Sequence, residues 1–306
     1  MQPLRGIALK LCAVMLFIIM LSLVKAVSAD VPAGQSVFFR SFFAIPVIVV
    51  WLLLRGELSV GLRVRSRMGH FWRGVIGTIA MGLNFAAVGF LPLPEVTAIS
   101  FTAPLLTVLL AALLLGETVR MFRLCAVALG LIGVLVVIEP RLTVFSSGPF
   151  EPSAAFGVGL VLLGAGFIAL AHVHIRKLTL SEHPAAIVFY FSLTSTSVAL
   201  CTLPFGWVLP SMMQTVLLVL IGLIGGVAQI FLTLSYRFAP ASVVAPFEYT
   251  AMLFSLMIGY VFFNELPTLQ MLIGAGIIIM AGLVIILREA QLGLKRGASK
   301  AVKPPA

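Results

Sequence analysis

The sequence predicts an all-α integral membrane protein with ten transmembrane helices, arranged as two inverted repeats of five. Of its 306 residues, 61% are hydrophobic and 10% are charged, whereas about a quarter of an ordinary soluble domain is charged. A soluble domain of this size must cover its surface with polar groups, so the composition excludes that class. Two further observations carry the prediction: charge-free runs of membrane length, and a one-sided distribution of Lys and Arg.

The charge-free runs predict the spans. A helix needs about 20 apolar residues to cross a hydrocarbon core of about 30 Å. Runs 74–94 and 96–116 each have 21 residues without a charge, and run 266–287 has 22, so each predicts one crossing. The same reasoning along the chain predicts helices at 8–28, 36–54, 71–91, 96–115, 122–139, 154–174, 185–203, 213–235, 243–263 and 267–287.

The seventh and eighth helices come from one long run. Residues 184–236 contain no charge over 53 positions, and a single helix of that length would extend for about 80 Å, more than twice the hydrocarbon core. Pro204, Gly206 and Pro210 interrupt the run. The run therefore predicts two spans joined by a turn at these residues.

The basic residues predict the orientation. Of the twenty Lys and Arg, seventeen fall on the side of the two termini and only Arg141 falls on the other, while Lys25 and Arg40 lie within spans. Basic loops remain in the cytoplasm, so both termini are expected there. Residues 27–29 also resemble a signal-peptide cleavage site, but Lys25 interrupts the approach to it, and losing the first span would invert every later loop.

The two halves show a weak internal repeat. A shift of 148 residues places Glu117 on Glu265, with further matches that include Pro92 on Pro240, Ala103 on Ala251, Phe101 on Tyr249 and Leu106 on Phe254. Five crossings per half would invert the second half, and such repeats place a binding site at their interface near the bilayer midplane. We expect repeats at 1–145 and 146–290, followed by a basic cytoplasmic tail at 291–306.

The segment around the fourth predicted helix resembles a known family. Residues 91–99 (LPLPEVTAI), 103–105 (APL) and 114–117 (LLGE) are similar to the signature of the drug/metabolite transporter superfamily, in its EamA-type branch. The resemblance covers nearly the whole chain. It implies a ten-helix carrier in the bacterial inner membrane that moves a small organic solute by alternating access.

Three other segments resemble a narrower group. Residues 1–6, 38–46 and 69–74 are similar to the bacterial riboflavin importers of the superfamily, and this resemblance implies riboflavin uptake. The alternative within transport is export of amino acids or other amphipathic metabolites. The expected partners are the solute and the lipid bilayer, with no nucleic acid, and the carrier is expected to be a monomer or a homodimer.

Charges within the spans are candidate functional groups because a charge in a membrane helix costs about 2.5–3.5 kcal/mol on insertion scales. Lys25 lies near the end of its span, so we expect its ammonium to reach water. Arg40 could bind an anionic or carbonyl group through its planar fork. The alternative for Arg40 is a structural ion pair with Glu95.

Glu248 is the third charge and the candidate for coupling. Pro246 removes a helical hydrogen bond nearby, and an opened helix beside the carboxylate and Tyr249 could bind polar substrate atoms or take up a proton. The alternative is an ion pair with Arg237. The uncharged candidates for lining the solute site are polar or aromatic residues of the same helices, namely Asn84, Ser100, Phe101, Gln229 and Tyr249.

Other classes of protein have less support. The sequence contains no HExxH, GxSxG or P-loop pattern, so no enzymatic activity, cofactor or metal is expected. A lipid-modifying enzyme should gather paired carboxylates or histidines at one membrane face, whereas this chain distributes its ionisable groups singly. Gly222 and Gly226 form a GxxxG pattern that favours close helix packing.

Overall fold

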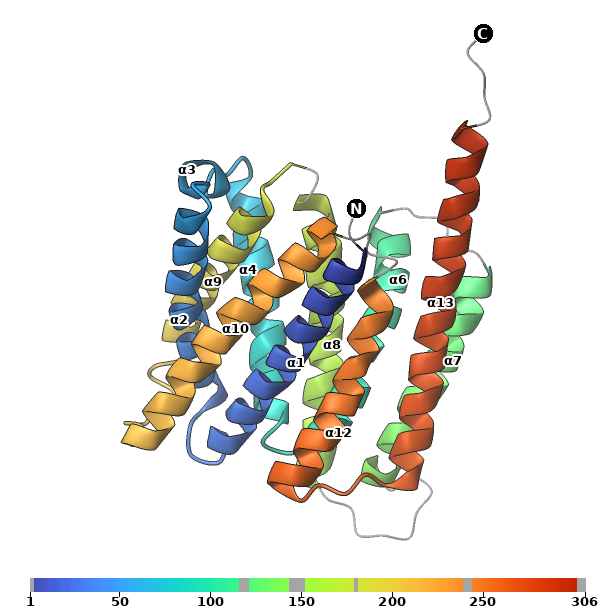
Figure 1. Ribbon diagram of the computed structural model, residues 1–306. Coiled ribbons are helices and arrows are strands. Elements are labelled where there is room, and N and C mark those ends of the chain that lie inside the picture. The colour runs from blue at the N-terminus through green and yellow to red at the C-terminus, as the bar shows by residue number, and fades with distance from the viewer. Residues whose placement is uncertain (1–2, 116–120, 143–151, 179–180, 239–243, 302–306) are drawn as a thin grey trace.

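A computed structural model describes residues 3–115, 121–142, 152–178, 181–238 and 244–301, and this part of the chain is helical with no strand (Figure 1). The elements are α1 (Pro3–Val27), α2 (Ala33–Leu54), α3 (Leu58–Gly61), α4 (Arg67–Ala87), α5 (Leu93–Ser100), α6 (Thr102–Leu115), α7 (Met121–Leu142), α8 (Pro152–Leu178), α9 (Pro184–Leu200), α10 (Met212–Phe238), η1 (Ala245–Tyr249), α12 (Thr250–Phe263) and α13 (Leu269–Ala301).

These elements confirm the predicted all-α membrane fold, although two of the predicted helices are interrupted. The fourth, expected to be continuous over 96–115, divides into α5 and α6 at Phe101. Pro104 has no N–H to donate to the carbonyl four residues earlier, at Ser100, so the helix opens there. The ninth, expected over 243–263, begins with the 3₁₀ turn η1, which contains Glu248, before α12 continues it.

The helix contacts have the pattern that an exchange of the two halves would produce. Helix α1 packs on α10, and α8, the first helix of the second half, packs on α4. Helix α2 packs on α10 in the same way that α9 packs on α4. In two further pairs, α2 with α9 and α7 with α13, the two partners occupy corresponding positions of the two halves. Each half is therefore buried largely against the other.

The outside of the bundle is apolar. Leu53, Leu135, Leu163 and Val261 are all more than half exposed, which is the arrangement expected when lipid surrounds the protein. In the described part of the chain, five helices are long and apolar enough to cross a membrane, and four shorter apolar helices accompany them. The chain therefore buries its backbone polar groups in helices and exposes apolar side chains.

Glycines permit the closest helix contacts. The backbone of Gly222 lies against Phe43 of α2, and that of Gly226 lies against Ala44 and Val47. The GxxxG pattern thus packs α10 on α2 within one chain, in agreement with the close helix packing that the sequence predicts.

Candidate functional site

The bundle has two ends. The start of α1 and the C-terminal end of α13 lie at one end, which we call the terminal face, while the loop between α12 and α13 lies at the opposite face beside the end of α1 (Figure 1). The sequence-predicted polar residues are distributed between these ends. The contacts of the charged residues among them fall into three groups.

The first group closes the opposite face. Lys25 Nζ lies 2.8 Å from Glu265 Oε1 and donates to the carbonyls of Leu91 at 2.7 Å and Val88 at 3.1 Å. The side chain of Lys25 is only 16% exposed. The expectation that Lys25 extends into water is therefore wrong, because the loop after α12 supplies a carboxylate within its reach.

The backbone after α12 places that carboxylate. Helix α12 ends at Phe263, and the next residue, Asn264, adopts the left-handed conformation (φ 53°) that Asn tolerates better than most residues. The N–H of Glu265 then donates back to the carbonyl of Gly259 at 2.9 Å. Its Oε2 accepts from the N–H of Leu93, at the start of α5, at 2.8 Å. Glu265 therefore joins α12 to α1 and to α5.

The second group lies deeper in the bundle and contains Arg40. The side chain of Arg40, in α2, is 5% exposed, and its Cζ lies 5.5 Å from the centroid of the Phe191 ring in α9. Among the described residues, no ion pair or hydrogen bond joins Arg40 to Glu95, and Arg40 Nε has no acceptor. The expected alternative of an ion pair with Glu95 is therefore not found.

A second arginine contacts the same ring. Arg73 Cζ, in α4, lies 4.2 Å from the Phe191 centroid, and Nε and Nη1 of Arg73 are buried without an acceptor in the described part of the chain. Its guanidinium lies over Gly77, where a Cβ would overlap it. Sequence reasoning missed Arg73 because it counted this residue with the cytoplasmic charges at the start of the predicted helix 71–91, whereas α4 begins six residues before it, at Arg67.

The third group is near the terminal face. Lys10 Nζ contacts Glu248 Oε2 at 3.2 Å, with Lys10 2% exposed and the Glu248 side chain 50% exposed. His172, an exposed residue of α8, lies within electrostatic range of Glu248, Arg73 and Lys10. Sequence reasoning counted Lys10 with the cytoplasmic charges although it falls within the predicted helix 8–28. In the structure α1 begins at Pro3, and Lys10 is buried.

The uncharged candidates meet in pairs. Ser100 donates to Asn84 Oδ1 at 3.1 Å, while Asn84 Nδ2 donates to the carbonyl of Ala80. The Phe101 and Tyr249 rings lie edge to face with centroids 5.0 Å apart. Gln229 lies in α10, half-buried. The structure thus couples α4 with α5 and the two interrupted helices with each other.

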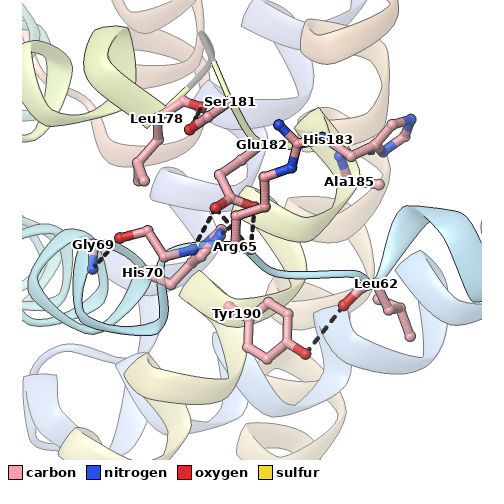
Figure 2. Close-up of polar contacts among 11 residues, drawn as sticks. Leu62, Arg65, Gly69, His70, Leu178, Ser181, Glu182, His183, Ala185 and Tyr190 are labelled. Atoms are coloured by element: carbon pink, nitrogen blue, oxygen red, sulfur yellow. Dashed lines mark hydrogen bonds and ion pairs between the residues drawn. The ribbon is translucent and has the colours of Figure 1, made fainter.

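A polar cluster at the terminal face fixes the start of α4 (Figure 2). Glu182, in the loop before α9, accepts from the N–H of Ser66 at 2.7 Å and of Arg65 at 3.0 Å. His70 Nε2 lies 3.4 Å from the same carboxylate, and the His70 ring lies 5.2 Å from that of Tyr190. This cluster holds the first turn of α4 against α9, and Arg73 follows His70 by one turn.

The Glu182 cluster also determines the charge state of its carboxyl group. Burial alone would raise the pKa of Glu182. The backbone N–H groups of Ser66 and Arg65, together with His70, outweigh burial and hold the pKa below its usual value of 4.5. The carboxylate is therefore the form that the folded protein favours.

Comparisons with known proteins agree with this architecture. A model of the EamA-like transporter family matches residues 4–139 and 155–288. One solved crystal structure is similar over 94% of this chain and 98% of its own, with a TM-score of 0.65 and 21% sequence identity. That likeness concerns the fold.

Three named relatives are similar over most of their length. The pseudopaline exporter of Pseudomonas aeruginosa is 31% identical over 277 residues, which cover 90% of this chain and 94% of that protein. An uncharacterized transporter of Helicobacter pylori is 30% identical, covering 95% and 97%. The S-adenosylmethionine uptake transporter of Rickettsia prowazekii is 28% identical, covering 82% of each.

Proposed function

Because the chain belongs to the EamA-like transporter family, and is thus a multi-pass membrane transporter, we propose that it is a secondary carrier of a small organic metabolite. We place it in a bacterial inner membrane with both termini in the cytoplasm, as the distribution of Lys and Arg favours. The carrier works by alternating access, in which a site between the two halves opens first to one side and then to the other.

The observation that carries this proposal is the difference between the two ends of the bundle. At the opposite face, Lys25 and Glu265 form a mostly buried pair between α1 and the loop after α12. At the terminal face, Glu248 is half exposed and His172 is exposed. These features are those of a carrier that is closed at one face and accessible at the other. The accessible face is the terminal face, which we place in the cytoplasm, so the proposed state is open to the cytoplasm.

Riboflavin uptake is a second candidate for the function. None of the relatives named above carries riboflavin in its name, so this candidate rests on the resemblance of residues 38–46 and 69–74 to riboflavin importers. One observation favours keeping it. These two segments contain Arg40 and Arg73, the two arginines that contact the Phe191 ring, so the resemblance includes residues of the candidate site.

Counterflow in proteoliposomes tests the proposal. Vesicles containing the purified full chain are loaded with one unlabelled solute and diluted into the same labelled solute, using riboflavin, amino acids and aromatic carboxylates in turn. A carrier transiently accumulates label for its own solute, and protein-free vesicles supply the baseline. Accumulation of labelled riboflavin alone would select the second candidate, and no accumulation of any solute would contradict the function.

A further inference from the structure

Arg40 and Arg73 share one aromatic ring and no counter-ion among the described residues. They come from α2 and α4, and their Cζ atoms lie 5.5 Å and 4.2 Å from the centroid of Phe191 in α9. The two guanidinium carbons can therefore be no farther apart than these distances combined. Both groups stay charged at any physiological pH, so they repel each other in this interior.

The ring compensates only part of this charge. A guanidinium above an aromatic ring is attracted through its face, which leaves the N–H groups in its plane available. Nε of Arg40, and Nε and Nη1 of Arg73, are buried and have no acceptor in the described ranges. Buried donors almost always have an acceptor, so the geometry indicates that an acceptor from outside the chain belongs here.

The surrounding charges favour an anionic acceptor. Three charged groups lie within electrostatic range of His172, namely Arg73, Lys10 and Glu248. Glu248 is the carboxylate of this region, and its oxygen contacts Lys10 at 3.2 Å. Among the described residues that these interactions connect, positive groups therefore exceed negative groups. A guanidinium fork binds the two oxygens of a carboxylate or phosphate through parallel N–H donors.

We propose that Arg40 and Arg73 together bind an oxyanion of the transported solute, a carboxylate or a phosphate group, between α2 and α4. This inference rests on the proposed function and specifies its substrate class. Phe191 is a positioning residue, because its ring contacts the guanidiniums and leaves their N–H groups to the solute. Arg73 is further positioned by its contact with Gly77.

Binding of matched probes tests the inference without requiring transport. The probes are phenylacetate with phenylacetamide, and riboflavin 5′-phosphate with riboflavin, so that each pair differs in an anionic group. Affinities are obtained from the concentration dependence of the unfolding temperature of the full chain in phosphatidylcholine nanodiscs. We expect at least one anionic probe to bind more tightly than its neutral partner by about tenfold or more, as charge-assisted hydrogen bonds imply.

Matched variants locate the preference. Arg40→Gln and Arg73→Gln should each remove it, whereas Arg55→Gln should keep it, because Arg55 pairs with Glu57 and lies over Trp51 elsewhere on the terminal side. Gly77→Ala retains every charge but displaces the Arg73 guanidinium, and it should weaken anion binding. Gly82→Ala in the same helix has open space at its Cβ and should not.

Five results would overturn the inference. Equal affinities within both probe pairs would do so, and so would a preference that survives Arg40→Gln and Arg73→Gln. If the glutamine variants do not fold, an unchanged preference in Gly77→Ala serves the same purpose. Loss of probe binding on adding phosphatidylglycerol would assign the site to a lipid phosphate instead. Counterflow of a neutral solute would leave the transport function standing while the oxyanion inference fails.

Discussion

The rings of Phe101 and Tyr249 meet edge to face, with centroids 5.0 Å apart and planes inclined by 63°. Phe101 directly follows α5, and Tyr249 ends η1, so each ring lies where a membrane helix is interrupted. The two residues are separated by the 148 positions that also separate Glu117 from Glu265. Equivalent residues of two inverted repeats can touch in this way only close to the axis that relates the repeats.

The Tyr249 side chain has a tight contact that a single methyl group tests. Its phenol lies against the backbone of Gly282 in α13, where a Cβ would overlap the ring. Gly282→Ala should lower the free energy of unfolding by about 1–3 kcal/mol through overpacking. Gly276→Ala, in the same helix with open space at its Cβ, should be neutral or stabilising by up to about 1 kcal/mol. Denaturation in detergent compares the two, and equal effects would contradict this contact.

The Glu182 cluster predicts a pH dependence of stability. Because the pKa of Glu182 is lower in the folded protein than its usual value of 4.5, the stabilisation is present above pH 4.5 and is lost as pH falls through the lowered pKa. Glu182→Gln should therefore cost about 1–3 kcal/mol at pH 7, and the difference from wild type should shrink below pH 4.5. Thermal unfolding of wild type and Glu182→Gln at pH 7 and below pH 4.5 measures this difference in stability. A difference that grows in acid would contradict the lowered pKa of Glu182.

The Lys10–Glu248 pair is predicted to belong to the transport path. Glu248 is half exposed, so Glu248→Gln should insert and fold normally, yet it removes a charged partner from Lys10 and should reduce counterflow about tenfold. Glu57→Gln is the control, since Glu57 contacts Arg55 outside the site. Wild-type counterflow in Glu248→Gln would leave Glu248 as an interfacial residue, and the binding assignment would then rest on the arginines.

Orientation is predicted by the positive-inside distribution alone. A reporter that is active only outside the cytoplasm should give signal when it is fused within 204–207, the turn between the seventh and eighth predicted spans. The same reporter fused after Lys295 should give none. The reverse pattern would show that the termini lie outside, and the accessible end of the bundle would then face outward.

The sequence was sufficient to predict the helices because hydrophobic length is a local property. It was also sufficient to single out Arg40 and Glu248, because charges in apolar runs are visible without coordinates. The break at Phe101 had a local signal, Pro104, which was not used. The boundaries of the repeats at 145 and 290 stay predictions.

Partners were not predictable from the sequence, because they depend on how distant helices pack. Lys25 and Glu265 are 240 positions apart, and their pairing requires the left-handed turn at Asn264 to aim the carboxylate. Arg73 and Lys10 were counted with the cytoplasmic charges because each is the third residue of its predicted helix, and a charge near a helix end is normally solvated. In the structure α1 and α4 begin earlier than the apolar runs do, so both residues lie about one turn farther inside their helices than predicted.

Reversible cross-linking of the opposite face tests the central claim, that the carrier alternates by separating Lys25 from Glu265. Lys25→Cys and Glu265→Cys are introduced after Cys12, Cys125 and Cys201 are replaced by serine, and a bis-methanethiosulfonate reagent of similar length joins them in proteoliposomes. Lys25→Cys alone, treated in the same way, is the control. The account predicts that cross-linking stops counterflow and that a reductant restores it. Undiminished counterflow after complete cross-linking would contradict it.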